Sequence, residues 1–352
     1  MNEYTEYEGK TILVTGGAGC IGSNLCKRFS ELHAKKVIIL DNLSSTYEWN
    51  IPHAENILFL KGDILDDAML QQVFKDKPEY VFHLAAHFAN QNSVDNPELD
   101  LMVNGMGILK VLQHSHHSEV RRFVYSSSGC GVYGLGSKMP FKEHDISISL
   151  HTPYQVTKLL GELYTNYFHN LYEVPVVNAR FFNVYGPGEI PGRYRNVIPN
   201  FFYWAMNKQP LPITGDGSET RDWTYVDDIV NGLLAMGIRE EAIGEAINLG
   251  SGTETKVIEM AKMVNTFTGN DAGMIFSERR NWDVKTRLLS SIDKAKKLLD
   301  YKPQTLFEDG LKHVHLWFKE NWWNIQESAE FPDHLKQQWR NAASQKTQEI
   351  FP

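Results

Sequence analysis

Tyr154 and Lys158 are the residues whose types and spacing point most directly to chemistry. They lie four positions apart in Y-Q-V-T-K, so a helix would place both side chains on one face, one turn apart. Pro153, directly before them, is typical of a helix start. A free tyrosine has a pKa near about 10 and is a poor base at neutral pH, but a neighbouring ammonium favours the phenolate. The pair is either an activated base that takes a proton from a hydroxyl, or an ordinary surface pair on an amphipathic helix.

A cluster of small hydroxyl and thiol residues begins at Ser126 and reads S-S-S-G-C-G-V-Y-G. We choose Ser128 as the hydroxyl that shares a proton with Tyr154, whereas Ser126 and Ser127 suit turn positions. Cys130 is either a small packed residue or a thiol that faces a ligand. A thiol has a pKa of about 8.5, and its surroundings would have to lower that value before it could act as a base.

A glycine-rich turn near the start of the chain indicates a dinucleotide site. The apolar run Thr11–Val14 predicts a buried strand. It leads into a turn with four glycines, Gly16, Gly17, Gly19 and Gly22. A helix that begins near Ile21 would then offer free N–H groups and the positive end of its dipole to a pyrophosphate.

Asp41 follows a second apolar run, Val37–Leu40, which completes a strand–helix–strand unit. A carboxylate at this place accepts hydrogen bonds from a ribose diol and repels a 2′-phosphate, so NAD is favoured over NADP. The alternative is a tight turn followed by a surface aspartate. With NAD bound, the nicotinamide cation would add to the effect of Lys158 on Tyr154, which could then take a proton from a hydroxyl while a hydride leaves the same carbon.

Strand and helix patterns alternate through the first half of the chain. Further strands are expected at 57–61, 80–84, 122–126 and 176–179, and helices at 68–74, 104–116 and 154–172. This alternation predicts an α/β fold with a Rossmann-type doubly wound parallel sheet. Ligands of such sheets bind outside the carboxyl ends of the strands. The residues Asp41, Asp63, 85–87 and 126–128 should therefore meet in one crevice.

The pattern changes after Phe182, where glycines and prolines interrupt the chain. We predict an NAD-binding Rossmann domain over residues 1–182 and a smaller, mainly substrate-binding mixed α/β domain over 183–318. A strand expected at 246–249 could be interleaved with the first domain. Residues 319–352 are expected to form a C-terminal tail.

Composition excludes several classes of protein. The 352 residues carry a net charge of −8 without a long basic run, which argues against nucleic acid and anionic membrane as partners. The first residues do not resemble a signal peptide, and no apolar run is long enough to span a membrane. The three cysteines, Cys20, Cys26 and Cys130, indicate a reducing cytoplasm, not a disulfide framework. We expect no bound metal.

Taken together, the motifs resemble the extended short-chain dehydrogenase/reductase family. They are T-G-G-x-G-x-x-G at 15–22, the acid at 41, G-D-I at 62–64, H-L-A-A at 83–86, the serine cluster, Y-x-x-x-K and F-N-V-Y-G-P at 182–187. The resemblance runs from about residue 10 to residue 318. It implies an NAD-dependent enzyme that acts on a nucleotide sugar, similar to the UDP-glucose/UDP-galactose 4-epimerases, and a homodimer formed through the helices at 104–116 and 154–172.

The resemblance also implies roles for individual residues. Those implied to contact NAD are Gly16, Gly19, Cys20, Ile21, Gly22, Asp41, Asn42, Asp63, Ile64, Leu84, Ala85, Ala86, Asn104, Ser126, Tyr154, Lys158 and Phe182. Those implied to contact the nucleotide sugar are Ser128, Asn183, Asn196, Val197, Arg221, Arg280 and Asp283. Arginine forks suit the oxygens of a diphosphate, although each arginine alone could equally be a surface charge. Arg193, Arg195 and Arg287 could bind a carboxylate or phosphate of the substrate or be surface charges. His87 and Glu143 are titratable groups without a predicted position.

The residues after Ser128 distinguish the reactions of the family. Its members remove a proton from a sugar hydroxyl, usually at C4, and pass the hydride to NAD. Dehydratases then use an Asp-Glu pair after the serine, and decarboxylases a nearby glutamate. This chain has Gly129 and Cys130 instead. Epimerisation of a UDP-sugar at C4 through a transient 4-keto intermediate is therefore the expected reaction.

Two alternatives stay open. A 4,6-dehydratase or another keto-intermediate enzyme could use Cys130, which resembles the cysteine of GDP-mannose 3,5-epimerases. The partner lysine of those enzymes would align near Val197, which cannot act as an acid or base. The other alternative is a non-catalytic dinucleotide-binding protein. The presence of Ser128, Tyr154 and Lys158 argues against it, because a pure binder has no need of an activated tyrosine.

Overall fold

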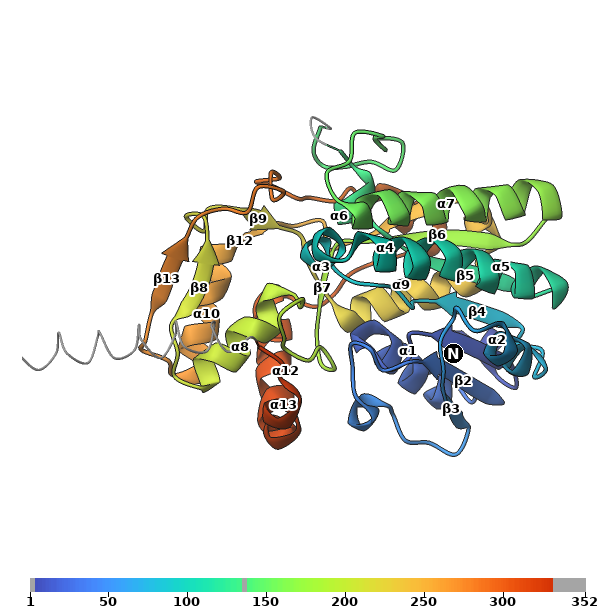
Figure 1. Cartoon of the computed structure of the whole chain (residues 1–352), viewed down its shortest axis with the longest axis horizontal. Helices are drawn as coiled ribbons and strands as arrows, with labels where there is room; N and C mark the ends of the chain where they lie inside the picture. Colours follow the sequence, from blue (N-terminus) through green and yellow to red (C-terminus); the bar gives the residue numbers. More distant parts are fainter. Residues whose placement is uncertain (1–3, 135–137, 332–352) are drawn as a thin grey trace, which may run out of the picture.

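Short apolar runs form the centre of the protein as seven parallel strands in one sheet, ordered β11-β6-β5-β4-β1-β2-β3 (Figure 1). The structure is a computed structural model and describes residues 4–134 and 138–331. The strands of the sheet are β1 (Thr11–Thr15), β2 (Lys36–Asp41), β3 (Ile57–Lys61), β4 (Tyr80–His83), β5 (Arg122–Ser128), β6 (Val176–Phe181) and β11 (Ala246–Leu249). The predicted Rossmann-type doubly wound sheet is confirmed.

Helices cover both faces of the sheet because its strands are apolar on both sides. Along β2, Val37 and Ile39 pack on one face and Ile38 and Leu40 on the other. The helices of the first face are α1 (Cys20–Glu31) and α9 (Val226–Ile238), and those of the second face are α2 (Asp67–Phe74), α5 (Gly107–His117) and α7 (Pro153–Tyr172). The sheet therefore has a buried core on each side, and its ligands must reach it from an edge.

The helix expected at 104–116 is preceded by a wider turn. A π-helical segment, Leu101–Met106, leads into α5 and packs against α7. Such segments are common near functional sites, because the extra residue redirects side chains. Here it places the buried side chain of Asn104 between the two helices.

The second half of the chain forms a smaller group of helices and short strands at one end of the sheet, on the left of Figure 1. Its helices are α8 (Val197–Met206), α10 (Val257–Thr268), α12 (Phe307–Glu320) and α13 (Trp322–Ser328), whereas α11 (Asp293–Leu299) packs against β11 and α9 at the main sheet. Its strands pair as β7 (Asn183–Tyr185) with β10 (Trp223–Tyr225), β8 (Leu211–Thr214) with β13 (Met274–Ser277), and β9 (Thr220–Arg221) with β12 (Thr255–Lys256). β11 returns to the main sheet beside β6.

Short helical segments complete the described chain. They are η1 (Thr5–Tyr7), η2 (Glu48–Asn50), α3 (Asn90–Asp95), α4 (Pro97–Asp100), α6 (Gly129–Val132) and η4 (Glu240–Ala242). The domain limits at 182 and 318 stay predictions. Residues 332–352 of the predicted tail lie outside the described residues.

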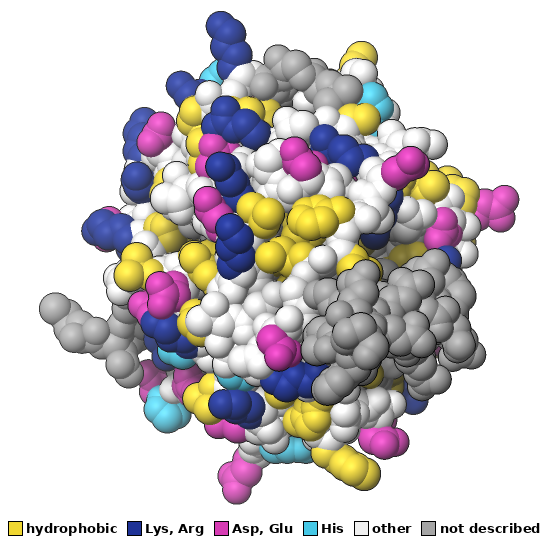
Figure 2. Space-filling model, turned by 90° about the vertical axis from the view of Figure 1, so that its left-hand side faces the viewer, with side chains coloured by type: hydrophobic (Ala, Val, Ile, Leu, Met, Phe, Trp, Pro, Cys, Tyr) yellow, Lys and Arg dark blue, Asp and Glu magenta, His cyan; other side chains and the backbone are white. Residues whose placement is uncertain are grey.

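The described residues contain no helix that is long and apolar enough to cross a membrane, and no group of three or more side chains arranged to hold a metal ion. The cysteines at positions 20, 26 and 130 are free. Figure 2 shows the end of the molecule formed by the second half of the chain, where basic and acidic side chains are interspersed.

Candidate functional site

The carboxyl ends of β1, β2, β4 and β5 open into one cavity of about 860 Å³. Every residue expected to contact NAD or the nucleotide sugar lines this cavity, with the exception of Asn104. The second half of the chain supplies the opposite wall, with residues of α8, β8, β9 and β13. The cavity therefore lies at the edge where a parallel sheet binds its ligands.

Glycines allow the turn after β1 to pass very close to its neighbours. Gly16 has φ +72°, and a Cβ there would lie 2.6 Å from the backbone nitrogen of Ala85. A Cβ on Gly22 would lie 2.3 Å from the carbonyl oxygen of Gly16. At the N-cap of α1, Gly19 has no side chain to occupy the first amides, and a Cβ there would lie 3.5 Å from the carbonyl oxygen of Gly16. This arrangement fits a dinucleotide, whose diphosphate is stabilised by a free helix N-terminus.

Two acids stand at the adenosine end of the cavity. Asp41 ends β2, and its carboxylate accepts hydrogen bonds from the backbone N–H groups of Ala18 at 3.0 Å and Leu43 at 2.9 Å. Asp63 accepts from the side chain of Asn42 at 2.9 Å. Burial raises the pKa of Asp41, while its two backbone hydrogen bonds lower it. The carboxylate is thus held in a fixed position, where it can accept from a ribose diol.

The predicted catalytic residues meet where β5 ends and α7 begins. The Tyr154 side chain is 8% exposed, and it lines the cavity together with Ser128, whose hydroxyl acts to lower the pKa of the phenol. Ser128 also accepts a hydrogen bond from the N–H of Gly131 at 3.1 Å. Lys158 donates from Nζ to the carbonyl oxygen of Ser126 at 2.7 Å, and Nζ lies 5.7 Å from the centre of the Tyr154 ring. A hydroxyl pair and an ammonium therefore face one point of the cavity.

Burial disfavours the charged forms of both Tyr154 and Lys158. It raises the pKa of Tyr154, and the hydrogen bond to Ser128 acts in the opposite direction. It lowers the pKa of Lys158 to about 8, although the nearby Asp100 carboxylate raises it. Lys158 is not among the groups that shift the pKa of Tyr154, so the lowering that we expected from its ammonium does not offset burial. A further positive charge beside the phenol would be needed to favour the phenolate.

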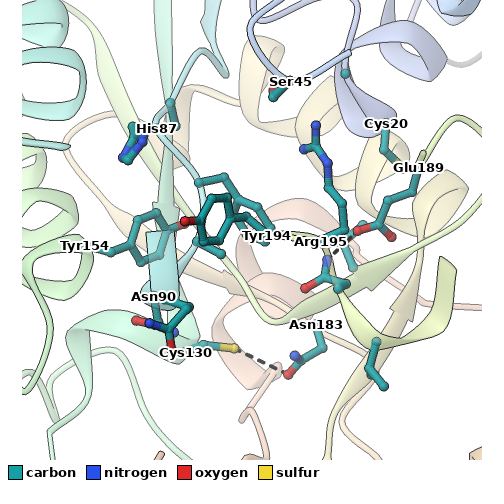
Figure 3. A pocket seen from close by; sticks show the side chains of 18 of the residues that line it. Cys20, Ser45, His87, Asn90, Cys130, Tyr154, Asn183, Glu189, Tyr194 and Arg195 are labelled. Carbon is teal, nitrogen blue, oxygen red and sulfur yellow. Dashed lines mark hydrogen bonds between the residues drawn. The ribbon is translucent and has the colours of Figure 1, made fainter. Parts of the chain in front are cut away.

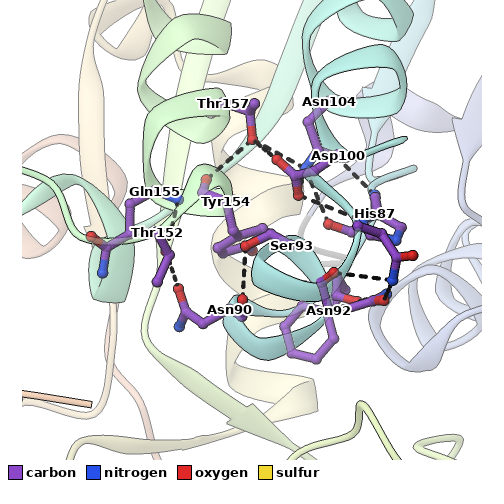
Figure 4. A network of polar contacts seen from close by, with 12 residues as sticks. His87, Asn90, Asn92, Ser93, Asp100, Asn104, Thr152, Tyr154, Gln155 and Thr157 are labelled. Carbon is purple, nitrogen blue, oxygen red and sulfur yellow. Dashed lines mark hydrogen bonds and ion pairs between the residues drawn. The ribbon is translucent and has the colours of Figure 1, made fainter. Parts of the chain in front are cut away.

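Asn104 lies behind the cavity wall and is hydrogen-bonded to the backbone of His87, which lines the cavity. Its amide donates to the carbonyl oxygen of His87 at 3.1 Å and to Asp100 at 3.0 Å, and its own oxygen accepts from the N–H of His87 at 2.8 Å (Figure 4). Asp100 is fully buried and accepts from Thr157 of α7 at 2.6 Å. The network joins the loop after β4 to the helix that carries Tyr154. The contact of Asn104 with NAD stays a prediction.

The opposite end of the cavity carries the arginines expected to bind a diphosphate. Arg221 donates to the carbonyl oxygen of Thr220 at 2.9 Å and pairs with Asp283 at 3.5 Å. The guanidinium of Arg280 lies 5.6 Å from the centre of the Trp282 ring. Both arginines line the cavity, so the structure brings them together with Asp283 as one polar group.

Asn183 and Asn196 line the same cavity with their amides already paired (Figure 3). Asn183 accepts from the thiol of Cys130 at 3.4 Å, and Asn196 donates to Glu189 at 2.6 Å. Burial raises the pKa of Cys130 to about 11, although Lys285 and Arg221 act to lower it. The ammonium of Lys285 donates to the backbone carbonyls of Cys130 and Tyr133. Cys130 faces the cavity as a neutral thiol.

The cavity is also lined by titratable residues to which the sequence analysis assigned no definite role, among them His87, Glu189 and Arg195. From the sequence, Arg195 was expected mainly as a surface charge, as were Arg193 and Arg287. Arg193 is half exposed and lines the cavity. Arg287 pairs with Glu254 outside the cavity. The spacing of Asp100 and Asn104, four residues apart, could have indicated a side-chain pair on a helix. No sequence signal indicated that Glu189 would be buried.

The comparisons with known proteins agree with this arrangement. Residues 12–250 match the family described as NAD dependent epimerase/dehydratase. The chain belongs to this family. The resemblance to extended short-chain dehydrogenases/reductases is therefore confirmed, NAD is the cofactor, and the chain is an NAD-dependent nucleotide-sugar epimerase.

Individual relatives are similar over almost their whole length. A solved epimerase of Methanothermobacter thermautotrophicus is 73% identical, with a TM-score of 0.92 over 93% of this chain and 97% of that one. The UDP-glucose 4-epimerase of Thermotoga maritima, solved with UDP-glucose, is 34% identical, with a TM-score of 0.84 over 89% and 99% of the two chains. A UDP-glucose 4-epimerase of Mycolicibacterium smegmatis is 33% identical over 87% of this chain and 98% of its own length.

Replacing Asp41 by alanine should raise the dissociation constant of NAD⁺ by about tenfold, because the ribose loses an ionised acceptor. NADP⁺ should bind more tightly than it does to the wild type, since the repulsion of its 2′-phosphate is removed. Both constants can be measured by calorimetric titration of cofactor-stripped protein. The control is Asp76→Ala, which removes an exposed carboxylate paired with Lys36 at 3.0 Å and should leave both constants unchanged. Equal constants for the wild type and D41A would contradict the assignment of Asp41.

Proposed function

We propose that the protein epimerises a UDP-sugar at C4 through a transient 4-keto intermediate. The observation that carries this proposal is that Tyr154 and Ser128 line one cavity while no carboxylate occupies positions 129 and 130. A base is present for one hydroxyl, and the acids that a dehydratase needs are missing from residues 129 and 130. The UDP-glucose 4-epimerases among the relatives support the choice of a UDP-sugar.

The chain's residues would act in sequence on the C4 hydroxyl. Ser128 and Tyr154 hold the hydroxyl, and Tyr154 takes its proton, while the ammonium of Lys158 beside the ring favours the phenolate. NAD, held by the glycine turn after β1 and by Asp41, would supply the hydride acceptor for C4. After the keto-sugar has turned over, Tyr154 gives the proton back to the oxygen. No net proton or hydride is lost, so the reaction needs no further acid or base.

The polar group around Arg221 would hold the other end of the substrate. Guanidinium groups bind diphosphate oxygens in a forked geometry, and Arg221 and Arg280 both line the cavity. Asp283 would then accept from the ribose of the nucleotide. Anchoring at the nucleotide leaves the sugar able to present either face at C4, as epimerisation requires.

A second candidate reaction uses Cys130, because its sulfur lies in the same cavity. A thiolate beside C3 or C5 of a keto-sugar could exchange the acidic proton there. Two observations make this the weaker candidate. The pKa of the thiol is raised to about 11 by burial, and the ammonium of Lys285 is bonded to backbone carbonyls.

The hydroxyl of Tyr154 is the group to test first. Tyr154→Phe should lower kcat by about 10²- to 10⁴-fold, because it removes the proton acceptor without changing the shape of the cavity. The assay is NMR of the protein with a panel of UDP-hexoses, UDP-N-acetylhexosamines and UDP-hexuronates. An epimerase gives an isomer of equal mass, a dehydratase a product lacking water, and a pure binder no product. Tyr164→Phe, on the same helix, is the control and should keep full activity.

Turnover of Y154F near the wild-type rate would rule out Tyr154 as the base. The NAD content of both variants should match that of the wild type, which separates lost chemistry from lost cofactor.

The role of Cys130 can be decided by running the reaction in D₂O. C4 epimerisation returns the same hydride, so the product should carry no deuterium on any ring carbon, and Cys130→Ala should still form it. Deuterium at C3 or C5 that disappears in C130A would contradict C4 epimerisation alone and support the second candidate. NMR and mass spectrometry of the product measure both outcomes.

We further propose that two copies of the chain form a homodimer. The π-helical segment and α7 expose large apolar side chains, namely Leu101, Met102, Val156, Leu163, Tyr167 and Leu171, at 47–58% of their surface. Contiguous apolar surface of this kind is typical of a subunit interface. Sedimentation should give twice the chain mass of 40.3 kDa, and a single-chain mass at micromolar concentration would contradict the proposal. A cytoplasmic location stays a prediction.

A further inference from the structure

The segment between β7 and α8 carries two ionisable residues, Glu189 and Arg195, that the reaction above does not use. Glu189 and Arg195 both line the cavity, and both are drawn in Figure 3 with Ser45 and Cys20, the first residue of α1. The charge of Arg195 lowers the pKa of Cys20 and of Asp41, which places the guanidinium near both. Arg195 therefore faces the cofactor half of the cavity, although it belongs to the half that holds the substrate.

The guanidinium of Arg195 has no partner among the described residues. No side chain or carbonyl oxygen of residues 4–134 and 138–331 forms a hydrogen bond or an ion pair with it. Burial lowers the pKa of Arg195, because its charge is partly removed from water. Glu189 and Glu330 attract the guanidinium, but neither forms an ion pair with it. The N–H groups of Arg195 are thus available to a ligand of negative charge in the cavity.

Glu189 does not supply that anion by direct contact. It is 9% exposed, one carboxylate oxygen accepts from Asn196 at 2.6 Å, and the other has no hydrogen-bond partner. Burial raises the pKa of Glu189 to about 7. Glu189 attracts Arg195, but their charged atoms lie farther apart than the 4 Å limit of an ion pair. Glu189 therefore holds Asn196 and orients the segment, and leaves the guanidinium free for a ligand.

Two diphosphates are available to Arg195, that of the dinucleotide and that of the nucleotide sugar. The dinucleotide diphosphate must lie between Asp41, which marks the adenosine ribose, and Tyr154, which marks the nicotinamide. The uncapped N-terminus of α1 lies along this path. The substrate diphosphate already has Arg221 and Arg280, at the end of the cavity formed by β9 and the loop after β13. Arg195 acts on Cys20 and Asp41, which lie on the cofactor side of the cavity, and this favours the dinucleotide as its ligand.

We propose that Arg195 binds the diphosphate of NAD from the substrate-binding half, opposite the N-terminus of α1. The cofactor is then held by both halves of the chain, and it can leave only when the segment 188–196 moves away from α1. This gives a reason why an enzyme that regenerates its cofactor in each cycle would retain it between cycles. The inference rests on NAD as the cofactor and not on which sugar is the substrate.

The test compares ligands with and without the diphosphate on cofactor-stripped protein. Arg195→Gln should raise the dissociation constants of NAD⁺ and of ADP-ribose by about 10- to 100-fold, as expected for lost charge-assisted hydrogen bonds. The constant for adenosine should change little. The constant for UDP, measured on protein reloaded with NAD, should also change little. Arg193→Gln is the matched control, because Arg193 lies in the same segment, is half exposed and pairs with Asp95 at 3.3 Å.

Two results would overturn the proposal. If R195Q weakens UDP but leaves ADP-ribose unchanged, Arg195 belongs to the substrate diphosphate. If neither constant changes, it is a surface charge without a ligand. Should R195Q fail to fold, Arg195→Lys is the substitute, because it keeps the positive charge and removes the forked N–H groups of the guanidinium. A raised dissociation constant of this variant for ADP-ribose would support the proposal, and an unchanged constant would contradict it. These binding constants do not depend on epimerase activity, so a failure of the proposed reaction would leave the test intact.

Discussion

A buried ion pair between α7 and the sheet determines where the catalytic groups stand. Arg180 of β6 donates to both carboxylate oxygens of Glu162 at 2.8 and 2.7 Å, and the two side chains are 3% and 4% exposed. Ser127 of β5 donates to the same carboxylate. Removing one partner of such a pair typically costs about 3–5 kcal/mol, because a buried charge is left unpaired. The position of α7 relative to the end of β5 is therefore strongly constrained, and with it the contact between Tyr154 and Ser128.

The polar contacts of α7 continue toward its N-terminus. Lys158 is bonded to the end of β5, and Thr157 to the network of Asp100 and Asn104. These contacts satisfy the buried polar groups, yet burial still opposes charge on the phenol and on the ammonium. Burial therefore disfavours ionisation of Tyr154 before the cofactor binds. A positively charged nicotinamide beside Tyr154 would change this balance, which couples the reactivity of the tyrosine to the bound cofactor.

The sequence predicted the elements of this site better than the contacts between them. Buried strands are runs of apolar residues, and the position of Asp41 and the spacing of Tyr154 and Lys158 follow from regular geometry, so all of these could be derived from local patterns. Glu162 and Arg180 could not, because a charged residue on a helix or strand is usually exposed, and only the packing of α7 on the sheet shows that both are buried. The same reason applies to Glu189 and Arg195. Asn104 was expected in the cavity wall but lies behind it, since the π-helical segment turns its side chain toward α7.

The central claim is that one carbon of the sugar exchanges a hydride with the cofactor beside Tyr154. The most direct measurement uses a UDP-hexose with deuterium at C4, incubated with the protein in ordinary water. The account predicts a slower reaction than with the unlabelled sugar, and an epimer that keeps its deuterium at C4, because the hydride never leaves the site. Loss of the label to water, or an epimer inverted at a carbon other than C4, would contradict it.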